Sequence, residues 1–358
     1  MKQALLGAAL AVLLLSGSTA IGAQNDSLRI YWIDVEGGAS TLFVSPTGES
    51  LLFDTGNPGN GDRDAKRIFA TAKKAGLTRI DHVVISHWHG DHVGGLEALS
   101  KMIPLGKFYD HGDQVEQADK ARHDSYVSIS GNNRKILRAG DMIGLGPVQF
   151  RVMVSEGPVI STAINGGGPN ALCTNAPQMS PAAPENIRMV SLAVNYGTFK
   201  YASLADLDWS RELELVCPVN KLGHVNLYTI NRHGSLDDSG APALLGAVKP
   251  QVVVFNNGPK KGLGQKDERS QPINAASATP YEKNSYLRVV KTAGNEGVWQ
   301  LHRSLLDPDP AHNTSADMTA NMEQEGDQGF GLTAVVAPDG KFMISNDRNM
   351  FSKSYVAH

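Results

Sequence analysis

The stretch "HVVISHWHGDHVGG", residues 82–95, concentrates four of the chain's 11 histidines around a short apolar run. The valines and isoleucine that open it predict a buried strand, and "HVGGLEALSK" predicts the start of a helix. His87, His89, Asp91 and His92 therefore lie in the loop that leaves the carboxyl end of that strand. This spacing brings several imidazoles and a carboxylate close together.

Clustered imidazole nitrogens and carboxylate oxygens are suitable ligands for Zn²⁺ or a similar first-row divalent ion. Four such ligands are too many for one tetrahedral ion that keeps an open position, so we expect two ions that share more distant ligands. The alternative is a surface cluster of histidines that binds no metal. The stretch alone favours a dinuclear metal centre.

The first residues have the pattern of a secretory signal peptide. Lys2 is followed by an apolar run, "ALLGAALAVLLL", that is too short to span a bilayer, and then by small residues. We expect residues 1–23 to be removed, with cleavage after Ala23 or Ala20, and the mature chain to be periplasmic or secreted. A membrane anchor or a buried first helix is the alternative. No other segment reaches membrane-spanning length, so no membrane contact is expected after cleavage.

The charge balance limits the classes of partner. The chain has 33 Lys and Arg against 36 Asp and Glu, a formal net charge of −3. Proteins that coat nucleic acid or an anionic membrane usually carry an excess of basic residues. We therefore expect a small-molecule or nucleotide-like substrate and no extended nucleic-acid surface. The sequence does not determine the oligomeric state.

The chain has two cysteines, Cys173 and Cys217. They are too few for a cysteine-ligated metal site. An oxidising compartment permits a disulfide between them, and closing a loop of this length would contribute about 4 kcal/mol to stability on the chain-entropy model. Sequence does not give the distance between the two thiols, so their pairing stays open at this point.

The apolar pattern predicts an α/β chain without internal repeats. Strands and helices alternate at first, strands dominate after about residue 126, and alternation returns near residue 209. Polar, Gly-rich and Pro-rich composition predicts loops at residues 157–184, 260–281 and 307–328. We expect one main domain over residues 24–300. An extension, residues 301–358, is expected to pack on that domain and to include a hairpin that turns at Asp339-Gly340.

The H-x-H-x-D-H motif that begins at His87 resembles the signature of the metallo-β-lactamase superfamily. "LLFDTG" resembles the superfamily's first aspartate motif, and "IDVEGGAS" resembles the opening of the branch related to DNA-uptake competence proteins (ComEC-like). The resemblance covers about residues 28–262. It implies an αββα sandwich that carries a hydrolase site and a C-terminal β-hairpin extension. It also implies that Asp54 braces the ligand loop rather than binding metal.

Two distant motifs supply the remaining ligands by the same resemblance. "ASLADLDW" matches the strand-end motif that carries a carboxylate shared by both metals, and "LYTINRHGS" resembles the last histidine motif of the branch. The implied cofactor is a pair of Zn²⁺ ions, with Mn or Fe also possible. Site one is implied to hold His87, His89 and Asp206, with Asn186 or water completing it. Site two is implied to hold Asp91, His92, Asp206 and His233.

This sequence departs from the branch at three places. Ala205 stands where glycine is usual, and Arg232 stands where histidine is usual. Most of the superfamily has a third histidine for the first metal, but the corresponding "PENIRMVSLAV" has none. Similar members of the branch carry asparagine there, which makes Asn186 the positional match. We therefore expect the first site to bind its ion more weakly than the second.

Other polar residues lie near the predicted site. His111 in "FYDHGD" either lines the cleft, replaces the missing ligand or is an ordinary loop histidine. Asn257, Lys260 and Lys261 follow the strand "QVVVFNN" at the same end of the sheet. A Gly-Pro-Lys-Lys loop at that point either holds a phosphate or carboxylate or presents a solvated pair of charges.

The expected chemistry follows from the ions. A divalent ion lowers the pKa of water toward neutrality, which provides a hydroxide for attack on a carbonyl or phosphoryl centre. Asp91 and Asp206 are the predicted catalytic residues through the ions that they hold. The ComEC-like resemblance implies phosphodiester hydrolysis. The alternatives are hydrolysis of an amide, lactone or ester, β-lactams included, and a non-catalytic metal-binding protein.

Overall fold

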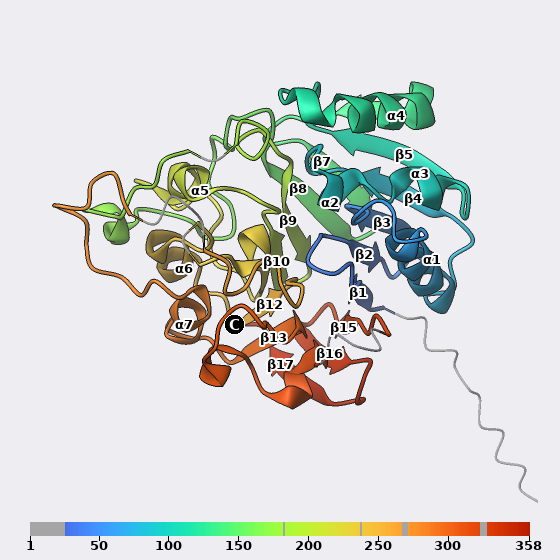
Figure 1. Cartoon of the computed structure of the whole chain (residues 1–358). Coiled ribbons are helices and arrows are strands. Elements are labelled where there is room, and N and C mark those ends of the chain that lie inside the picture. Colours follow the sequence, from blue (N-terminus) through green and yellow to red (C-terminus); the bar gives the residue numbers. More distant parts are fainter. Residues whose placement is uncertain (1–25, 182, 237, 267–270, 323–327) are drawn as a thin grey trace, which may run out of the picture.

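Two β-sheets pack face to face at the centre of the structure, and helices cover their outer faces (Figure 1). The computed structural model describes residues 26–181, 183–236, 238–266, 271–322 and 328–358. The predicted signal peptide lies outside the described residues. The layers confirm the predicted α/β class and are consistent with an αββα sandwich.

Sheet A has nine strands among the described residues, in the order β17-β16-β15-β1-β2-β3-β4-β5-β6. The strands β3 to β6 run parallel, whereas β1 pairs antiparallel with both β2 and β15. The bounds are β1 (Leu28–Trp32), β2 (Thr41–Val44), β3 (Ser50–Phe53), β4 (Ile80–Val84), β5 (Leu105–Asp110), β6 (Arg134–Ile136), β15 (Leu332–Val336), β16 (Lys341–Asn346) and β17 (Ser352–Val356).

Sheet B has eight strands in the described part of the chain, in the order β14-β13-β12-β11-β10-β9-β8-β7. The strands β10 to β14 run parallel, and β7 to β10 form an antiparallel series. The bounds are β7 (Met142–Leu145), β8 (Val148–Val154), β9 (Ser191–Tyr196), β10 (Phe199–Ser203), β11 (Leu227–Thr229), β12 (Val252–Phe255), β13 (Gly297–His302) and β14 (Thr319–Asn321).

Helices form the two outer layers because their apolar faces need a sheet to pack against. Sheet A is covered by α1 (Arg63–Lys74), α2 (Gly90–Val93), α3 (Leu96–Ser100) and α4 (Lys120–Ser130). Sheet B is covered by α5 (Trp209–Val216), α6 (Pro242–Val248) and α7 (Ser285–Val290). The 3₁₀ turns are η1 (Gln117–Asp119), η2 (Gly131–Asn133), η3 (Ala171–Cys173), η4 (Asn231–Gly234), η5 (Pro310–His312) and η6 (Ala316–Met318).

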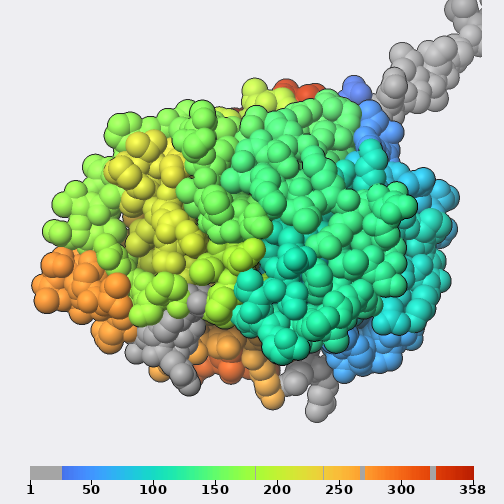
Figure 2. All heavy atoms as spheres, turned by 90° about the horizontal axis from the view of Figure 1, so that it is seen from above, coloured from blue at the N-terminus to red at the C-terminus, as the bar shows by residue number. Residues whose placement is uncertain are grey.

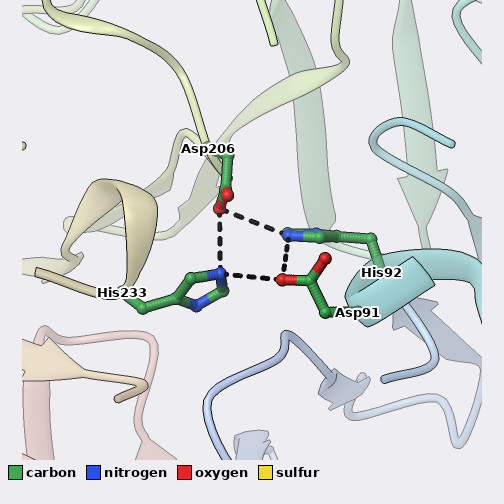
Figure 3. Close-up of side chains that lie close together, drawn as sticks. All are labelled: Asp91, His92, Asp206 and His233. Carbon is green, nitrogen blue, oxygen red and sulfur yellow. Dashed lines mark ion pairs between the residues drawn. The ribbon is translucent and has the colours of Figure 1, made fainter. Parts of the chain in front are cut away.

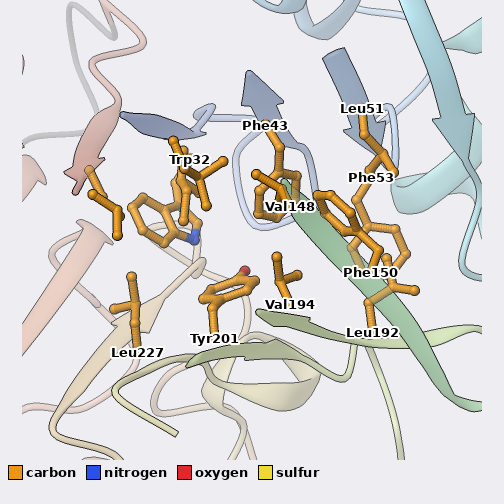
Figure 4. Close-up of a cluster of buried hydrophobic side chains, with 14 of the residues drawn as sticks. Trp32, Phe43, Leu51, Phe53, Val148, Phe150, Leu192, Val194, Tyr201 and Leu227 are labelled. Carbon is orange, nitrogen blue, oxygen red and sulfur yellow. The ribbon is translucent and has the colours of Figure 1, made fainter. Parts of the chain in front are cut away.

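The central core lies between the two sheets (Figure 4). The rings of Phe43 in sheet A and Phe150 in sheet B meet edge to face, with centroids 5.1 Å apart. Trp32 is buried, and its Nε1 donates a hydrogen bond to Thr229 Oγ1 at 2.8 Å. Full burial of a side chain of this size contributes about 1.5–3 kcal/mol. This core fixes the spacing of the sheets and therefore of the loops at their edges.

The parallel strands of both sheets end at one edge of the sandwich. In sheet A, β3 leads to Asp54 and β4 leads to His87; in sheet B, β10 leads to Asp206 and β11 leads to His233. Loops at the carboxyl ends of parallel strands are common positions for ligand sites. The packing of two sheets therefore assembles side chains from four loops far apart in sequence.

The C-terminal strands continue the two sheets. Beyond residue 300, β14 extends sheet B, and β15 to β17 extend sheet A beside β1, with the turn of the β15–β16 hairpin near Gly340. Cys173 and Cys217 form a disulfide that joins η3 to the end of α5. In the residues that the structure describes, no helix has the length and apolarity needed to cross a membrane.

Two elements differ from the sequence-based expectation. The sequence pattern does not predict the α4 helix, because its buried positions include His123 and Ser130 and form no apolar stripe. Figure 2 shows the turquoise and green part of the chain, which includes α4, covering much of one face of the molecule. The short β14 lies in a predicted loop, where pairing with β13 determines its conformation.

A buried carboxylate links α5 to the loop that carries η4. Glu212 accepts hydrogen bonds from Asn231 Nδ2 at 2.7 Å, Gly240 N at 2.9 Å and Ala241 N at 2.5 Å. Burial nevertheless raises the pKa of Glu212 from 4.5 to about 7, outweighing these donors and the nearby Arg288. The folded protein therefore favours the neutral carboxyl group over a pH range in which the unfolded chain is ionised.

This pKa makes stability depend on pH. Because the folded-state pKa is raised, the contribution of Glu212 is fully present below pH 4.5 and is lost as pH rises through about 7. The Glu212→Gln variant lacks this titration. The difference in free energy of unfolding, variant minus wild type, should rise by about 3 kcal/mol between pH 4.5 and pH 8 in urea denaturation.

The matched control is Glu214→Gln, because Glu214 lies on the same helix and its side chain is 52% exposed. Its free energy of unfolding should follow the wild-type pH dependence. A difference between wild type and Glu212→Gln that stays constant with pH would contradict the assignment.

Candidate metal centre

Four potential metal ligands from both sheets meet at the strand-end edge (Figure 3). Asp91 and His92 lie in α2, Asp206 follows β10, and His233 lies in η4. One ligand atom of each residue lies within 4.8 Å of the others. His92 Nε2 lies 3.5 Å from Asp91 Oδ2 and 3.3 Å from Asp206 Oδ1. His233 Nε2 lies 3.3 Å and 3.2 Å from the same two oxygens. We call these four residues the quartet.

Opposite charges in the quartet stabilise one another. Burial opposes a charge on His92, but the carboxylates of Asp206 and Asp91 raise its pKa well above the usual value. Burial also opposes a charge on His233, and Asp206 still raises its pKa. Although burial favours the neutral acids, the two histidines hold the pKa values of Asp206 and Asp91 well below the usual range. Each imidazole of the quartet thus faces negative charge, and each carboxylate faces positive charge.

The quartet fits a divalent cation. The Nε2 atoms of His92 and His233 are buried and have no hydrogen-bond partner of normal geometry among the described residues, although carboxylates face them. Two imidazoles and two carboxylates that converge in this way are ligands for Zn²⁺, Mn²⁺ or Fe²⁺. Such an ion would take the place of protons on these imidazole nitrogens, because a metal binds the neutral form of imidazole.

Asp54 braces the ligand loop, in the position that the resemblance implies. Its Oδ1 accepts a hydrogen bond from Ser86 N at 2.7 Å. Its Oδ2 accepts from Ser86 Oγ at 2.7 Å and from His92 Nδ1 at 2.8 Å. Because His92 Nδ1 is engaged in this way, its Nε2 is directed toward the quartet.

The backbone is strained where the loops of sheet B approach the site. Ala205, Arg232 and His233 have φ values of 52°, 46° and 55°, in the left-handed region that favours glycine. Arg232 N donates a hydrogen bond to Ala205 O at 3.1 Å, which joins the two loops. Gly262 packs against His233, and a Cβ at Gly262 would lie 2.5 Å from the His233 Cβ. This close packing directs Asp206 and His233 to one point.

His87 and His89, predicted for site one, lie beside the quartet. His87 Nε2 is 3.0 Å from His89 Nδ1, and the ring centroids of His87 and His92 are 4.1 Å apart. Burial lowers the pKa of His87 well below its usual value, and the neighbouring His92 and His89 lower it further. His87 is therefore neutral, the form of imidazole that binds a metal.

Asn186 and His111, the two other candidates for the missing ligand of the first site, are both engaged in contacts within the protein. Asn186 is buried, and its Nδ2 donates to the backbone oxygen of Asp206 at 3.3 Å, which supports the loop of that carboxylate. His111 does not line the cleft, because it is fully buried and pairs through Nε2 with Glu185 Oε1 at 2.7 Å. Glu185 also accepts hydrogen bonds from Trp88 N and Val115 N.

The predicted Gly-Pro-Lys-Lys loop contributes one lysine to the site. Lys261 Nζ contacts Asp91 Oδ2 at 2.5 Å, whereas Lys260 is exposed to solvent and does not line the site. Asn257 is buried and donates to the carbonyls of Gly258 and His302, so it does not face the quartet. The loop therefore places one positive charge beside the quartet.

A hollow of about 100 Å³ adjoins the quartet. It is lined by Asp206 and His233 together with three basic residues, Arg232, Lys261 and Lys266. Arg232 also forms an ion pair with Asp238. Three cationic side chains beside two potential metal ligands suit an anionic group.

Sequence reasoning missed several acidic residues around the ligand loop. Glu116 Oε2 and Asp119 Oδ2 lie 3.4 Å and 3.9 Å from His89 Nε2. Glu185 holds the backbone between His87 and His89 through Trp88 N, at 3.2 Å. No motif signals these acids, because they come from loops whose positions depend on tertiary packing.

A second buried group of possible ligands lies near β1 and β13. His302 Nε2 lies 2.7 Å from Asp34 Oδ1, and Glu36 Oε1 lies 3.6 Å from His302 Nε2. The Arg67 guanidinium pairs with Asp34 Oδ2 at 2.9 Å. Since Arg67 already supplies a cation, this group is best explained as a structural ion-pair network.

The expected role of Asp206, a carboxylate shared by both metals, can be tested by comparing variants at Asp206 and Asp208. Asp206→Asn should keep the fold but weaken divalent-ion binding by roughly 100-fold or more, because an amide cannot balance cationic charge as a carboxylate does. Equilibrium dialysis followed by elemental analysis would measure the loss, and circular dichroism would check the fold.

Asp208→Asn is the matched control. Asp208 caps α5 by accepting a hydrogen bond from Arg211 N at 3.0 Å, and asparagine caps a helix equally well. Metal loss in Asp208→Asn together with normal binding in Asp206→Asn would place the carboxylate ligand two residues later.

Part of the chain is similar to known proteins. Residues 33–170 match the model of the Metallo-beta-lactamase superfamily. The chain is 36% identical over 117 residues to "Competence protein ComA" of Neisseria gonorrhoeae, covering 32% of this chain and 16% of that protein. It is 34% identical over 76 residues to "Atrochrysone carboxyl ACP thioesterase dmxR1" of Cryptosporiopsis sp., covering 21% and 23%.

The matches thus span about a quarter or less of these curated relatives' lengths. Among solved structures, the metallo-beta-lactamase fold protein YhfI from Bacillus subtilis is similar at 12% identity and a TM-score of 0.43, covering 77% of this chain and 96% of that one. The ComEC-like branch stays a prediction. Residues 33–170 therefore support a metallo-beta-lactamase superfamily domain in this chain.

Proposed function

We propose that this chain is a hydrolase with a dinuclear metal centre that acts on phosphodiester-type substrates. The observation that carries the proposal is the position of the quartet, which opens onto a hollow lined by Arg232, Lys261 and Lys266. Ligands for a cation and side chains for an anion thus meet at one point. Superfamily relatives also support a hydrolase.

The residues of the site have distinct roles in this proposal. When bound, the divalent ions supply Lewis-acid activation of water and of a substrate oxygen. Asp91 and Asp206 place negative charge between the imidazoles of His92 and His233. Asp54 fixes the orientation of His92, and His87 remains neutral because it is buried.

An anionic substrate is favoured by the charge around the hollow. A phosphodiester carries one negative charge, and charge grows on its oxygens during attack, so a nearby cation stabilises the transition state. Lys261 lies at the quartet itself through its contact with Asp91. A neutral lactone or ester would gain less from this residue.

Acyl hydrolysis is the second candidate, because several curated relatives are named as ACP thioesterases. Their matches cover only short parts of both chains, and an acyl thioester does not require the basic residues of the hollow. Lactone, ester and β-lactam substrates belong to the same class of carbonyl electrophile. A substrate panel must therefore include both phosphodiesters and acyl compounds.

We also propose that the chain is exported and acts on a small-molecule or nucleotide-like substrate. The apolar run after Lys2 and the Cys173–Cys217 disulfide support export, since disulfides persist mainly in oxidising compartments. Two ions per chain, with Zn²⁺, Mn²⁺ or Fe²⁺ as the candidates, complete the proposal. Elemental analysis of purified protein would identify the native metal.

The lysine of the hollow provides the test of substrate class. Lys261→Ala should lower kcat/KM for a phosphodiester such as bis(p-nitrophenyl) phosphate by roughly 10- to 100-fold, because a charge that stabilises the transition state is lost. The same change should affect a neutral p-nitrophenyl ester by much less. Both rates would be measured on protein with equal metal content.

Lys260→Ala is the matched control, since Lys260 is exposed and does not line the hollow. Its phosphodiester rate should equal the wild-type rate. Strong lactonase, thioesterase or β-lactamase activity that is unaffected by Lys261→Ala, without phosphodiester turnover under any metal, would overturn the phosphodiester assignment in favour of acyl hydrolysis.

A further inference from the structure

Both ring nitrogens of His89 face polar groups. Its Nδ1 lies 3.0 Å from His87 Nε2. Its Nε2 lies 3.4 Å from Glu116 Oε2 and 3.9 Å from Asp119 Oδ2. A neutral imidazole has one N–H group, so only one of these two sides can receive a proton from His89.

The protonation of His87 follows from its other neighbour. Ser86 Oγ donates its hydrogen to Asp54 Oδ2 at 2.7 Å, because a carboxylate is a stronger acceptor than a neutral imidazole. Ser86 Oγ is then left as an acceptor, and it lies 2.9 Å from His87 Nδ1 and 3.2 Å from His92 Nδ1, which already donates to Asp54. The free lone pair of His87 is therefore on Nε2, the atom that faces His89.

The two carboxylates determine the orientation of His89. A hydrogen on His89 Nε2 is attracted by Glu116 and Asp119, whereas a hydrogen on Nδ1 would meet only the neutral imidazole of His87. With the hydrogen on Nε2, the lone pair of Nδ1 points toward His87 Nε2. In the metal-free chain one added proton between these nitrogens, which lie 3.0 Å apart, forms an N–H···N hydrogen bond, and a bound cation would take the place of that proton.

We propose that Glu116 and Asp119 orient His89 so that its Nδ1 faces His87 Nε2 and the ion expected at the first site, which lacks a third histidine. Carboxylates behind a metal-binding imidazole fix its tautomer and raise its basicity. The two acids are positioning residues, since they act on the ion through His89. The inference deepens the proposed function because it concerns the first ion of the same centre.

Asp119 is buried and is held in a fixed position near His89. Its residue surface is 1% exposed, and its Oδ2 has no hydrogen-bond partner in the described part of the chain. Its Oδ1 pairs with Arg122, whose Nε donates to the backbone oxygen of Trp88 at 3.0 Å. Asp119 is thereby held beside the residue that separates the two histidines.

Glu116 is connected to the same loop. Its Oε1 accepts a hydrogen bond from Glu185 N at 3.1 Å, and Glu185 Oε1 accepts one from Trp88 N at 3.2 Å. Glu185 precedes Asn186, the positional match of the missing histidine. The segment that lacks the third ligand thus fixes Glu116, and Glu116 faces His89.

Binding of Zn²⁺ to the full chain after removal of metal tests the inference without any substrate. Wild type should bind two ions, measured by dialysis and elemental analysis. In the double variant Glu116→Gln with Asp119→Asn, the affinity for one ion should fall by roughly 10- to 100-fold while the affinity for the other is unchanged. Each single variant, which keeps one carboxylate, should show a smaller loss.

Two further variants make the result specific. Asp113→Asn is the matched control, because Asp113 lies in the same loop with its side chain 84% exposed, and it should bind like wild type. His87→Ala should remove the same ion that the double variant weakens. Co²⁺ would serve as a spectroscopic probe, since loss of an imidazole ligand changes its absorption bands, and thermal unfolding of metal-free protein would verify folding.

Unchanged affinity for both ions in the double variant would overturn the inference. An ion that depends on Glu116 and Asp119 but survives His87→Ala would also overturn it, because the carboxylates would then bind the ion directly. Two ions bound as expected, without hydrolysis of any substrate, would instead contradict the proposed function and leave this inference standing.

Discussion

The geometry of the ligand loop depends on the carboxylate of Asp54. Its two oxygens accept hydrogen bonds from Ser86 N, Ser86 Oγ and His92 Nδ1. Burial raises the pKa of Asp54 in spite of these donors and the charge of His92, so an ionised Asp54 is stable only while they remain in place. Because one acid orients His92 directly and His87 through Ser86, both proposed metal sites depend on it.

The sequence predicted the parts of the site that lie within local motifs. The H-x-H-x-D-H spacing placed His92 and Asp91 at a strand end, and resemblance to short motifs indicated Asp206 and His233, which the structure brings to the same point. The order of parallel strands explains why these side chains converge, since a strand end fixes where the next residues lie.

The remaining contacts could not be predicted because they depend on packing between distant loops. Glu116 and Asp119 lie in a segment without an apolar period, and only the position of η1 and α4 brings them to His89. Lys260 and Lys261 are equivalent in sequence, but the turn after β12 directs only one of them to Asp91. Which of these side chains reaches the site depends on backbone geometry, and composition does not predict it.

Two of the three departures from the resembling branch, Ala205 and Arg232, lie where the backbone is strained. Ala205 and Arg232 both have positive φ, which costs roughly 1–2 kcal/mol for a residue other than glycine. The hydrogen bond from Arg232 N to Ala205 O, and the ion pair between Arg232 and Asp238, hold these conformations in place. The same strain sets the direction of His233, whose φ is also positive. Because the Arg232 side chain pairs with Asp238 while His233 lies in the quartet, this loop contributes a positive charge to the hollow and a potential ligand to the quartet.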